Sequence, residues 1–255
     1  MTVESARRAL TAATLAAALA LGGCATVAQQ GNGDAQPNGG AQAQRSRVDP
    51  LEGMNRAVFG FNEVLDDVLL RPVAKGYVLV VPEVFRWMIS NGLSNLEELR
   101  VALNQLLQGK PLLAGSDLLR FGINTVFGFG GIADIATELG LEHHREDFGQ
   151  TLGRWGVASG PYLVLPLFGP STLRDGLALA TVDWNTSPII ALRSDVVPGI
   201  FALAIIDVRA SLLKADRLLE GAALDKYLFL RDGYLQRRRN QIWDGEPPDE
   251  VVETK

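Results

Sequence analysis

The sequence predicts an all-α protein, and three observations support this class. Apolar residues recur at helical spacing through residues 49–243, and prolines and glycines stand where helices would begin and end. The sequence contains no series of strand-like runs that could build a sheet. Hydrophobic residues make up 47% of the 255 residues, which is enough for a core, yet no segment after residue 23 has the length and apolarity of a membrane-spanning helix.

Residues 1–23 have the pattern of a secretory signal peptide. Arg7 and Arg8 precede an apolar run over residues 9–21, which is too short to span a bilayer. The tetrapeptide LGGC at residues 21–24 resembles the lipobox at which bacterial lipoproteins are cut and acylated. Cys24 is the only cysteine, so an intramolecular disulfide is impossible. We expect Cys24 to carry N-acyl and S-diacylglycerol groups that anchor the mature chain to a membrane.

The segments that flank the folded domain are polar. Residues 24–48 are rich in Gly, Gln and Asn and are expected to form a disordered tether, and residues 244–255 an acidic disordered tail. Ala25 and Thr26 follow the cysteine without an aspartate, which resembles lipoproteins sorted to the outer membrane. Loss of residues 1–23 removes one acid and two bases and changes the formal charge from −5 to −6, so nucleic acid is not an expected partner.

The predicted domain, residues 49–243, begins with an amphipathic helix. Its apolar side chains recur at intervals of three and four residues, at Met54, Val58, Phe61, Leu65 and Val68. Acidic residues lie on the opposite side, so this helix is expected at a surface or an interface. Two further helices should begin at Pro72 and Pro82, where the missing N–H costs little.

Caps and breakers predict the remaining helices. Asn95 can cap a helix together with Glu98, and Gly109 can end it, before Pro111 begins the next one. Residues 161–168 form an apolar run that Pro166 interrupts, so we expect no long helix there. Three helices follow, over residues 172–184 with Thr172 and Asp175 as the cap, over residues 198–220, and over residues 224–243.

The stretch from Arg120 to Ile135 is the most unusual part of the sequence, because it combines four glycines with three phenylalanines. It predicts either a buried helix that ends in a tight turn or an element that contacts lipid. Residues 128–133 also fit a GxGxxA dinucleotide fingerprint. That fingerprint requires a βαβ unit, which this chain does not provide, so we expect no nucleotide cofactor.

Residues 142–160 are predicted to be a polar loop, and they offer little catalytic chemistry. His143 and His144 are adjacent, and no serine lies in a GxSxG elbow, so no hydrolase is indicated. Their acidic neighbours Glu142, Glu146 and Asp147 could bind a metal ion fortuitously, but a solvated charged loop is the favoured interpretation, and neither a metal nor an enzyme is predicted.

A series of ordered motifs over about residues 49–240 resembles the VacJ/MlaA family of outer-membrane lipoproteins. In chain order the motifs are DPLEGMNR at 49–56 with Phe61 and Asn62, NGLSNLEE at 91–98, the Phe- and Gly-rich segment 121–134, FGQTLGRWG at 148–156, GPY at 160–162, Leu165–Pro166, TLRD at 172–175 and RDGYLQR at 231–237. The long tether and the acidic tail of this chain depart from the family pattern at the ends only.

The resemblance implies a ring of amphipathic helices that lies in the inner leaflet of the outer membrane around an amphipathic channel. It also implies a trimeric porin and a soluble periplasmic lipid carrier of the MlaC kind as partners, with phospholipid as the transported ligand and no cofactor. Two alternatives stay open: a structural lipoprotein that scaffolds porins without lipid transfer, and a lipid-hydrolysing enzyme.

Two groups of residues are the candidate phospholipid contacts. The expected channel lining is Phe121, Asn124, Phe127, Gly128, Phe129, Gly130 and Gly131. Arg154 and Arg174 are basic residues that either form ordinary ion pairs, Arg174 with Asp175, or reach a lipid headgroup.

Overall fold

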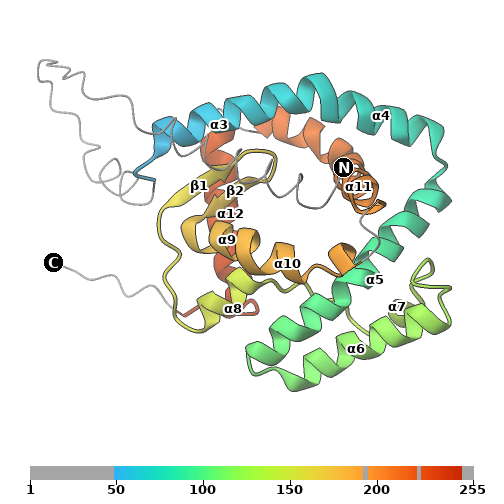
Figure 1. Ribbon diagram of the computed structural model, residues 1–255. Coiled ribbons are helices and arrows are strands. Elements are labelled where there is room, and N and C mark those ends of the chain that lie inside the picture. Colours follow the sequence, from blue (N-terminus) through green and yellow to red (C-terminus); the bar gives the residue numbers. More distant parts are fainter. Residues whose placement is uncertain (1–48, 192–194, 223–224, 249–255) are drawn as a thin grey trace, which may run out of the picture. The chain divides into compact units, whose positions relative to one another are not determined.

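The computed structural model describes residues 49–191, 195–222 and 225–248, and Figure 1 labels its elements. The predicted signal peptide, Cys24 and the predicted tether lie outside the described residues, as do residues 249–255 of the predicted tail. The three described segments include the whole predicted domain apart from residues 192–194 and 223–224.

Most of the described chain is helical, which confirms the predicted class. The α-helices are α3 (Glu52–Leu65), α4 (Arg71–Val80), α5 (Glu83–Leu107), α6 (Pro111–Val126), α7 (Ile135–Glu138), α8 (Phe148–Arg154), α9 (Leu173–Ala178), α10 (Trp184–Thr186), α11 (Val197–Ala222) and α12 (Lys226–Ile242). Two π-helical turns, η2 (Asp66–Leu70) and η3 (Leu179–Asp183), continue α3 and α9, and a 3-10 turn, η4 (Pro188–Ala191), follows α10.

One short antiparallel hairpin interrupts the helices, and the sequence did not predict it. Strand β1 (Tyr162–Leu165) pairs with β2 (Gly169–Thr172), with Tyr162 opposite Thr172. The apolar run 161–168 therefore forms a strand and a turn. Alternate residues Tyr162 and Val164 are buried, which is the period of a strand with one covered face.

Helix α3 is joined to this hairpin by two asparagines that lie two helical turns apart. The buried Asn55 donates from Nδ2 to the Tyr162 carbonyl (3.0 Å) and accepts from the Val164 N–H (2.9 Å). Asn62 repeats this arrangement with the Leu165 carbonyl (3.0 Å) and the Leu167 N–H (2.9 Å). The two amides thus satisfy one edge of β1, which would otherwise carry unpaired backbone groups.

The second and third helices begin near the predicted prolines, but the predicted start at Asn95 is wrong. Pro72 is the second residue of α4, and Pro82 immediately precedes α5. Helix α5 runs without a break through Asn95, whose buried amide donates to Thr125 Oγ1 on α6 (3.1 Å). No proline interrupts residues 83–107, so the helix continues, and Asn95 bonds a neighbouring helix rather than its own N-terminus.

The other predicted boundaries agree with the structure. Gly109 adopts a left-handed φ of 77° after α5, and Pro111 begins α6, which packs side by side with α5 (Figure 1). Thr172 caps α9 by accepting a hydrogen bond from the Asp175 N–H (3.3 Å). Helices α11 and α12 occupy the two predicted C-terminal segments.

Contacts between elements form a closed circuit. They run from α3 to β1, on through α9, η3, α10 and η4 to α5, and from α5 through α11 and α4 back to η2 and α3. Helix α6 lies outside this circuit, since its main contacts are with α5 and α7. The residues that join the circuit therefore come from segments far apart in the sequence.

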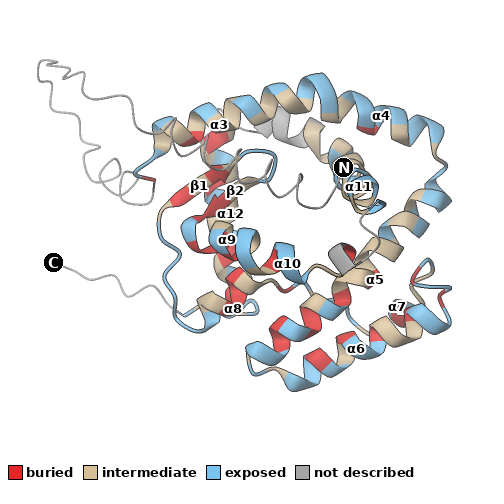
Figure 2. Ribbon diagram, viewed as in Figure 1, coloured by how far each residue is buried: buried red, intermediate tan, exposed pale blue. Residues whose placement is uncertain are grey.

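Buried residues are spread over several elements rather than gathered in one core (Figure 2), and many of them are polar or charged. The buried polar or charged residues include Asn55, Asn95, Glu98, Gln105, Asp117, Arg120, Asn124, Gln150, Arg174, Asp175, Arg231 and Arg238. Large apolar side chains are exposed instead, among them Leu79 and Leu112 (87% each) and Val68 (75%). Exposed apolar surface of this extent marks a surface that contacts something other than water.

Candidate functional site

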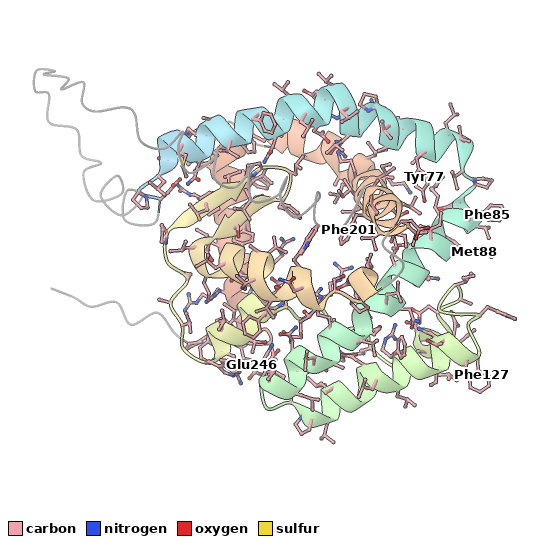
Figure 3. All side chains as sticks on the ribbon, in the orientation of Figure 1. Tyr77, Phe85, Met88, Phe127, Phe201 and Glu246 are labelled. Carbon is pink, nitrogen blue, oxygen red and sulfur yellow. The ribbon has the colours of Figure 1, made fainter. Side chains whose placement is uncertain are left out.

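A cavity of about 430 Å³ lies where α5, β2, η3, α11 and α12 approach one another, and it has two chemically different sides. The apolar side is formed by Phe168, Pro170, Leu179, Trp184 and Phe201. Phe201 points from α11 toward α10 and stacks on Trp184, with ring centroids 4.8 Å apart (Figure 3). The charged side is formed by Glu97, Arg100, Asp147, Asp175, Asp183, Arg237 and Arg238.

Arg238 organises the charged side. Its Nη atoms donate to the two carboxylate oxygens of Asp147 (2.6 Å each), and its Nε donates to Asp175 Oδ2 (2.9 Å). Tyr234 adds a hydrogen bond from its hydroxyl to Asp175 Oδ2 (2.8 Å). Burial raises the pKa of Asp147 and of Asp175, but the hydrogen bonds and charge of Arg238 outweigh it, and the pKa of each carboxyl is lowered overall.

A second ion pair completes the charged side. Arg100 donates from Nε to Glu97 Oε2 (2.6 Å) and from Nη1 to Asp183 Oδ1 (3.2 Å). Asp183 also accepts the Phe148 N–H (3.0 Å), yet burial dominates and raises its pKa. All four bordering acids are thus paired with Arg100 or Arg238, so this side is polar without a large excess of negative charge.

Two further cavities adjoin the first. One of about 460 Å³ lies between α5, the 143–147 loop and α11, and one of about 690 Å³ lies between that loop, α8 and α12. Gln241 borders all three cavities. Because lining residues are shared, the three cavities form a connected space that is lined by charged and amide side chains as well as apolar ones.

The 143–147 loop is held by buried acids and is not the solvated loop that the sequence favoured. His143 Nδ1 lies 3.0 Å from Glu98 Oε1, and His144 Nδ1 lies 2.9 Å from Asp117 Oδ1. Burial raises the pKa of Asp117. The charged segment folds onto the α5–α6 pair because that pair presents carboxylates where a core would normally be apolar. Part of the predicted loop is also helical, since Asp147 caps α8 by accepting the Gln150 N–H (2.9 Å).

No metal site is formed within residues 49–191, 195–222 and 225–248, where no group of three or more His, Cys, Asp or Glu side chains could hold an ion. In the same residues, no helix has the length and apolarity needed to cross a membrane.

The glycines of the predicted lining segment serve two different purposes. A Cβ on Gly128 would lie 2.1 Å from the Ala133 carbonyl oxygen, and one on Gly131 would lie 2.5 Å from the Asn95 Cβ. Gly130 has open space around it but adopts a φ of 79°. Gly130 is therefore needed for its backbone conformation, and the close approaches occur at Gly128 and Gly131.

The other predicted lining residues do not face the three cavities. Asn124 is buried and holds the turn, donating to Asp134 Oδ1 (2.9 Å) and accepting the Ala136 N–H (2.8 Å). Phe127 projects from the end of α6 and is 68% exposed (Figure 3), and Phe129 is 83% exposed. None of the seven residues borders these cavities, and α6 reaches them only through Leu113, near the end of the helix that lies away from the turn. This arrangement argues for an outward-facing apolar turn.

The two predicted headgroup arginines differ in their availability. Arg174 is 7% exposed and donates to Asp175 Oδ1 (2.9 Å) and the Val157 carbonyl (3.1 Å), so it is occupied within the fold. The structure therefore favours the ion pair with Asp175, which is the first of the two roles that the sequence offered for Arg174. Arg154 is exposed and lies over the Trp243 ring, 5.0 Å from its centroid.

The sequence alone does not reveal Arg238 as an organiser of the site. Arg238 lies in a basic run at 237–239 near the end of a helix, where the helix dipole favours cations without any particular partner. Only the fold brings Arg238 to Asp147, 91 positions earlier in the chain.

Comparison with known proteins identifies relatives over most of the chain. This chain is 40% identical over 204 residues to the intermembrane phospholipid transport system lipoprotein MlaA of Escherichia coli K12, and the match covers 76% of this chain and 78% of that one. The protein of the same name from Haemophilus influenzae is 34% identical over 254 residues, covering 94% and 92%. A chain from a solved structure on the maintenance of bacterial outer membrane lipid asymmetry shares 39% identity and a TM-score of 0.68, covering 77% of this chain and all of that chain.

These likenesses define the class as that of the mainly helical bacterial lipoproteins. The family model of the MlaA lipoprotein matches residues 47–241, so the chain belongs to the MlaA lipoprotein family.

Proposed function

We propose that this protein is a lipid-anchored outer-membrane component that removes mislocalised phospholipids from the outer leaflet and passes them to a periplasmic carrier. The cavity with one aromatic and one charged side carries this proposal. A phospholipid drawn through a wholly apolar wall would lose headgroup hydrogen bonds, at a cost of about 2–7 kcal/mol for each uncompensated polar group. A cavity with both chemistries avoids that cost and still accommodates acyl chains.

The distribution of burial supports a position within one leaflet. Exposed apolar side chains occur on α4, α5 and α6, for instance Leu79, Trp87 and Leu112, while charged pairs lie inside. Each apolar side chain transferred from water into hydrocarbon contributes about 1.5–3 kcal/mol. We propose that the closed circuit of elements is a ring in the inner leaflet of the outer membrane and that the connected cavities belong to its amphipathic channel.

The anchor and the partners of this proposal rest on the sequence and on the family. Acylation at Cys24 would hold the chain on the periplasmic face of the outer membrane. A trimeric porin would lie beside the ring, and a soluble MlaC-like carrier would receive the lipid. No covalent chemistry is assigned, so neither lysophospholipid nor free fatty acid should form when the purified protein is incubated with phospholipid.

Matched substitutions test whether the cavity handles lipid. Phe201→Glu places a charge on the aromatic side, whereas Phe229→Glu makes the same change at an exposed position of α12 that borders none of the three cavities. Phe201→Glu should abolish binding of phospholipid to the delipidated protein and raise outer-leaflet phospholipid in cells. Phe229→Glu should leave both unchanged, and thermal melting checks that each variant folds.

The alternative function, a scaffold for porins without lipid transfer, gives a different result in the same experiment. A scaffold would bind no phospholipid in either variant or in the unaltered protein, and Phe201→Glu would leave the outer leaflet unaffected as long as the porin remained bound.

A further inference from the structure

Two arginines that border the connected cavities form no ion pair within the described residues. Arg237 borders the 430 Å³ and 690 Å³ cavities, and Arg145 borders the 460 Å³ and 690 Å³ cavities. The other arginines of these walls, Arg100 and Arg238, are each paired with two carboxylates. Two cations without an acid are therefore brought to one cavity of a chain whose net charge is −5.

The backbone at Arg145 is fixed before any ligand arrives. On one side His144 is bonded to Asp117, and on the other Glu146 accepts from Gln108 Nε2 (2.8 Å). The Arg145 carbonyl itself accepts from Gln150 Nε2 (3.0 Å). The loop thus exposes the Arg145 side chain from an anchored backbone, which reduces the entropy lost when that side chain binds a ligand.

Arg237 is presented in a comparable way by α12. The next residue, Arg238, is fixed by Asp147 and Asp175 on the buried side of the helix, which sets the rotation of α12 and leaves Arg237 exposed. Three amide side chains border the same cavity beside it, from Gln236, Asn240 and Gln241, whereas the buried Gln150 already donates to the Arg145 carbonyl and to Asp147. Amides and arginines together offer hydrogen-bond donors suited to phosphate oxygens and to a polar headgroup.

The two acids that border the 690 Å³ cavity, Glu146 and Asp244, are both paired with Lys110. Lys110 Nζ lies 3.2 Å from Glu146 Oε1 and 2.5 Å from Asp244 Oδ1, so a third cation neutralises part of their charge. Neither acid forms an ion pair with Arg145 or Arg237 among the described contacts. An anion that enters the cavity therefore meets two available guanidinium groups.

We propose that Arg145 and Arg237 bind the phosphodiester group of a phospholipid in the 690 Å³ cavity, with an acyl chain directed toward the aromatic wall of the adjoining cavity. Arg237 and Gln241 border both cavities, so a lipid held there by its phosphate lies next to Phe168 and Trp184. Guanidinium groups bind phosphate through charge-assisted and bidentate hydrogen bonds, whereas Lys provides a point charge. The inference rests on the proposed lipid-handling function and names the residues that recognise the headgroup.

The test measures binding of a soluble short-chain phospholipid, dihexanoylphosphatidylglycerol, to the delipidated full-length protein. Arg145→Gln and Arg237→Gln should each weaken binding about tenfold and together about a hundredfold, in line with the loss of one charge-assisted interaction at each position. Lys75→Gln removes one positive charge at an exposed position of α4 and should leave the affinity unchanged. Binding of dihexanoylglycerol, which has no phosphate, should be the same in all four variants and in the unaltered protein.

Inorganic phosphate separates the two sources of the anion. If it binds the unaltered protein as tightly as the short-chain phospholipid, the pair recognises free phosphate and the inference is overturned. The inference is also overturned if the double variant binds the phospholipid with unchanged affinity. The same holds if the only change in that variant is a loss of binding to an acidic partner protein. If the unaltered protein binds no phospholipid, the proposed function fails instead. Unchanged melting of the arginine variants is expected, since both side chains are exposed.

Discussion

Arg238 on α12 and Asp147 at the start of α8 form a two-point ion pair, with both Nη–Oδ distances at 2.6 Å. The same arginine also donates to Asp175 on α9. One guanidinium group therefore links α8, α9 and α12 at the charged side of the 430 Å³ cavity. This geometry makes Arg238 a structural element of the site, in contrast to the adjacent Arg237.

Replacement of Arg238 by Met should destabilise the fold by about 3–5 kcal/mol, because Asp147 would lose its counterion and the buried Asp175 would keep only Arg174. Chemical denaturation measures this change in the free energy of unfolding. Arg237→Met is the matched control on the preceding residue and should change stability by no more than about 0.5 kcal/mol, as surface substitutions usually do. Equal effects of the two substitutions would contradict the assignment.

The penalty of Arg238→Met should depend on pH. In the unaltered protein the pKa values of Asp147 and Asp175 are lowered in the fold, so the stability they contribute is present above about pH 4 and is lost as the pH falls further. Without Arg238, burial would raise the pKa of Asp147, whereas Asp175 would keep Arg174, and protonation of Asp147 would then relieve the variant as the pH falls. The difference in unfolding free energy between the two proteins should therefore shrink from pH 7 to pH 4. A constant difference over that range would count against the ion pair as its cause.

Glycine substitutions in and before the 127–134 turn should separate steric crowding from backbone strain. Gly128→Ala would place a Cβ against two backbone oxygens, and we expect a loss of about 3 kcal/mol or more. Gly130→Ala has open space, so only its left-handed φ is penalised, by about 1–2 kcal/mol. Gly122→Ala within α6 also meets nothing within 4 Å and should stabilise the protein by up to about 1 kcal/mol. Thermal melting ranks the three variants, and a melting point for Gly128→Ala at or above that of Gly130→Ala would contradict the order.

The sequence predicted local structure more reliably than it predicted which side of each helix is buried. Thr172, Gly109 and Pro111 act over a few residues, so their roles could be inferred without the fold. Asn95 and His143 are used across long separations, and no local pattern reveals that Thr125 or Glu98 will be their partner. The usual rule that apolar faces point inward also fails here, since Asn55 is buried on α3 while Val68 of the apolar stripe is exposed.

The site shows the same limit. The residue types alone singled out the Phe- and Gly-rich segment and Arg174, but the fold places that segment away from the three cavities and pairs Arg174 with Asp175. Arg145 and Arg237 differ from their neighbours because the fold pairs the surrounding charges and, within the part of the chain that the structure describes, leaves these two without an acid. Such a distinction depends on tertiary contacts and cannot be inferred from residue type.

Phe129 provides the sharpest test of which way the central turn faces. It is 83% exposed and adopts a φ of 56°, a left-handed conformation that Asn tolerates far better than Phe. Phe129→Asn should therefore preserve or raise the melting temperature while it removes a large apolar ring. If that ring lies in the membrane, its loss should weaken binding to phospholipid vesicles by about 10- to 100-fold, equivalent to about 1.5–3 kcal/mol.

The vesicle measurement is best made in full-length protein that carries Cys24→Ala, so that acyl chains do not mask the contribution of the ring. Gly122→Ala in the same background is the control, since it alters α6 without removing an exposed aromatic side chain. If Phe129 instead lines the lipid path, as the sequence led us to expect, the opposite result follows. Vesicle binding would then be unchanged, and phospholipid transfer by the acylated Phe129→Asn protein would fall. Weaker vesicle binding with transfer preserved per membrane-bound molecule would establish that the turn faces the acyl chains of the bilayer.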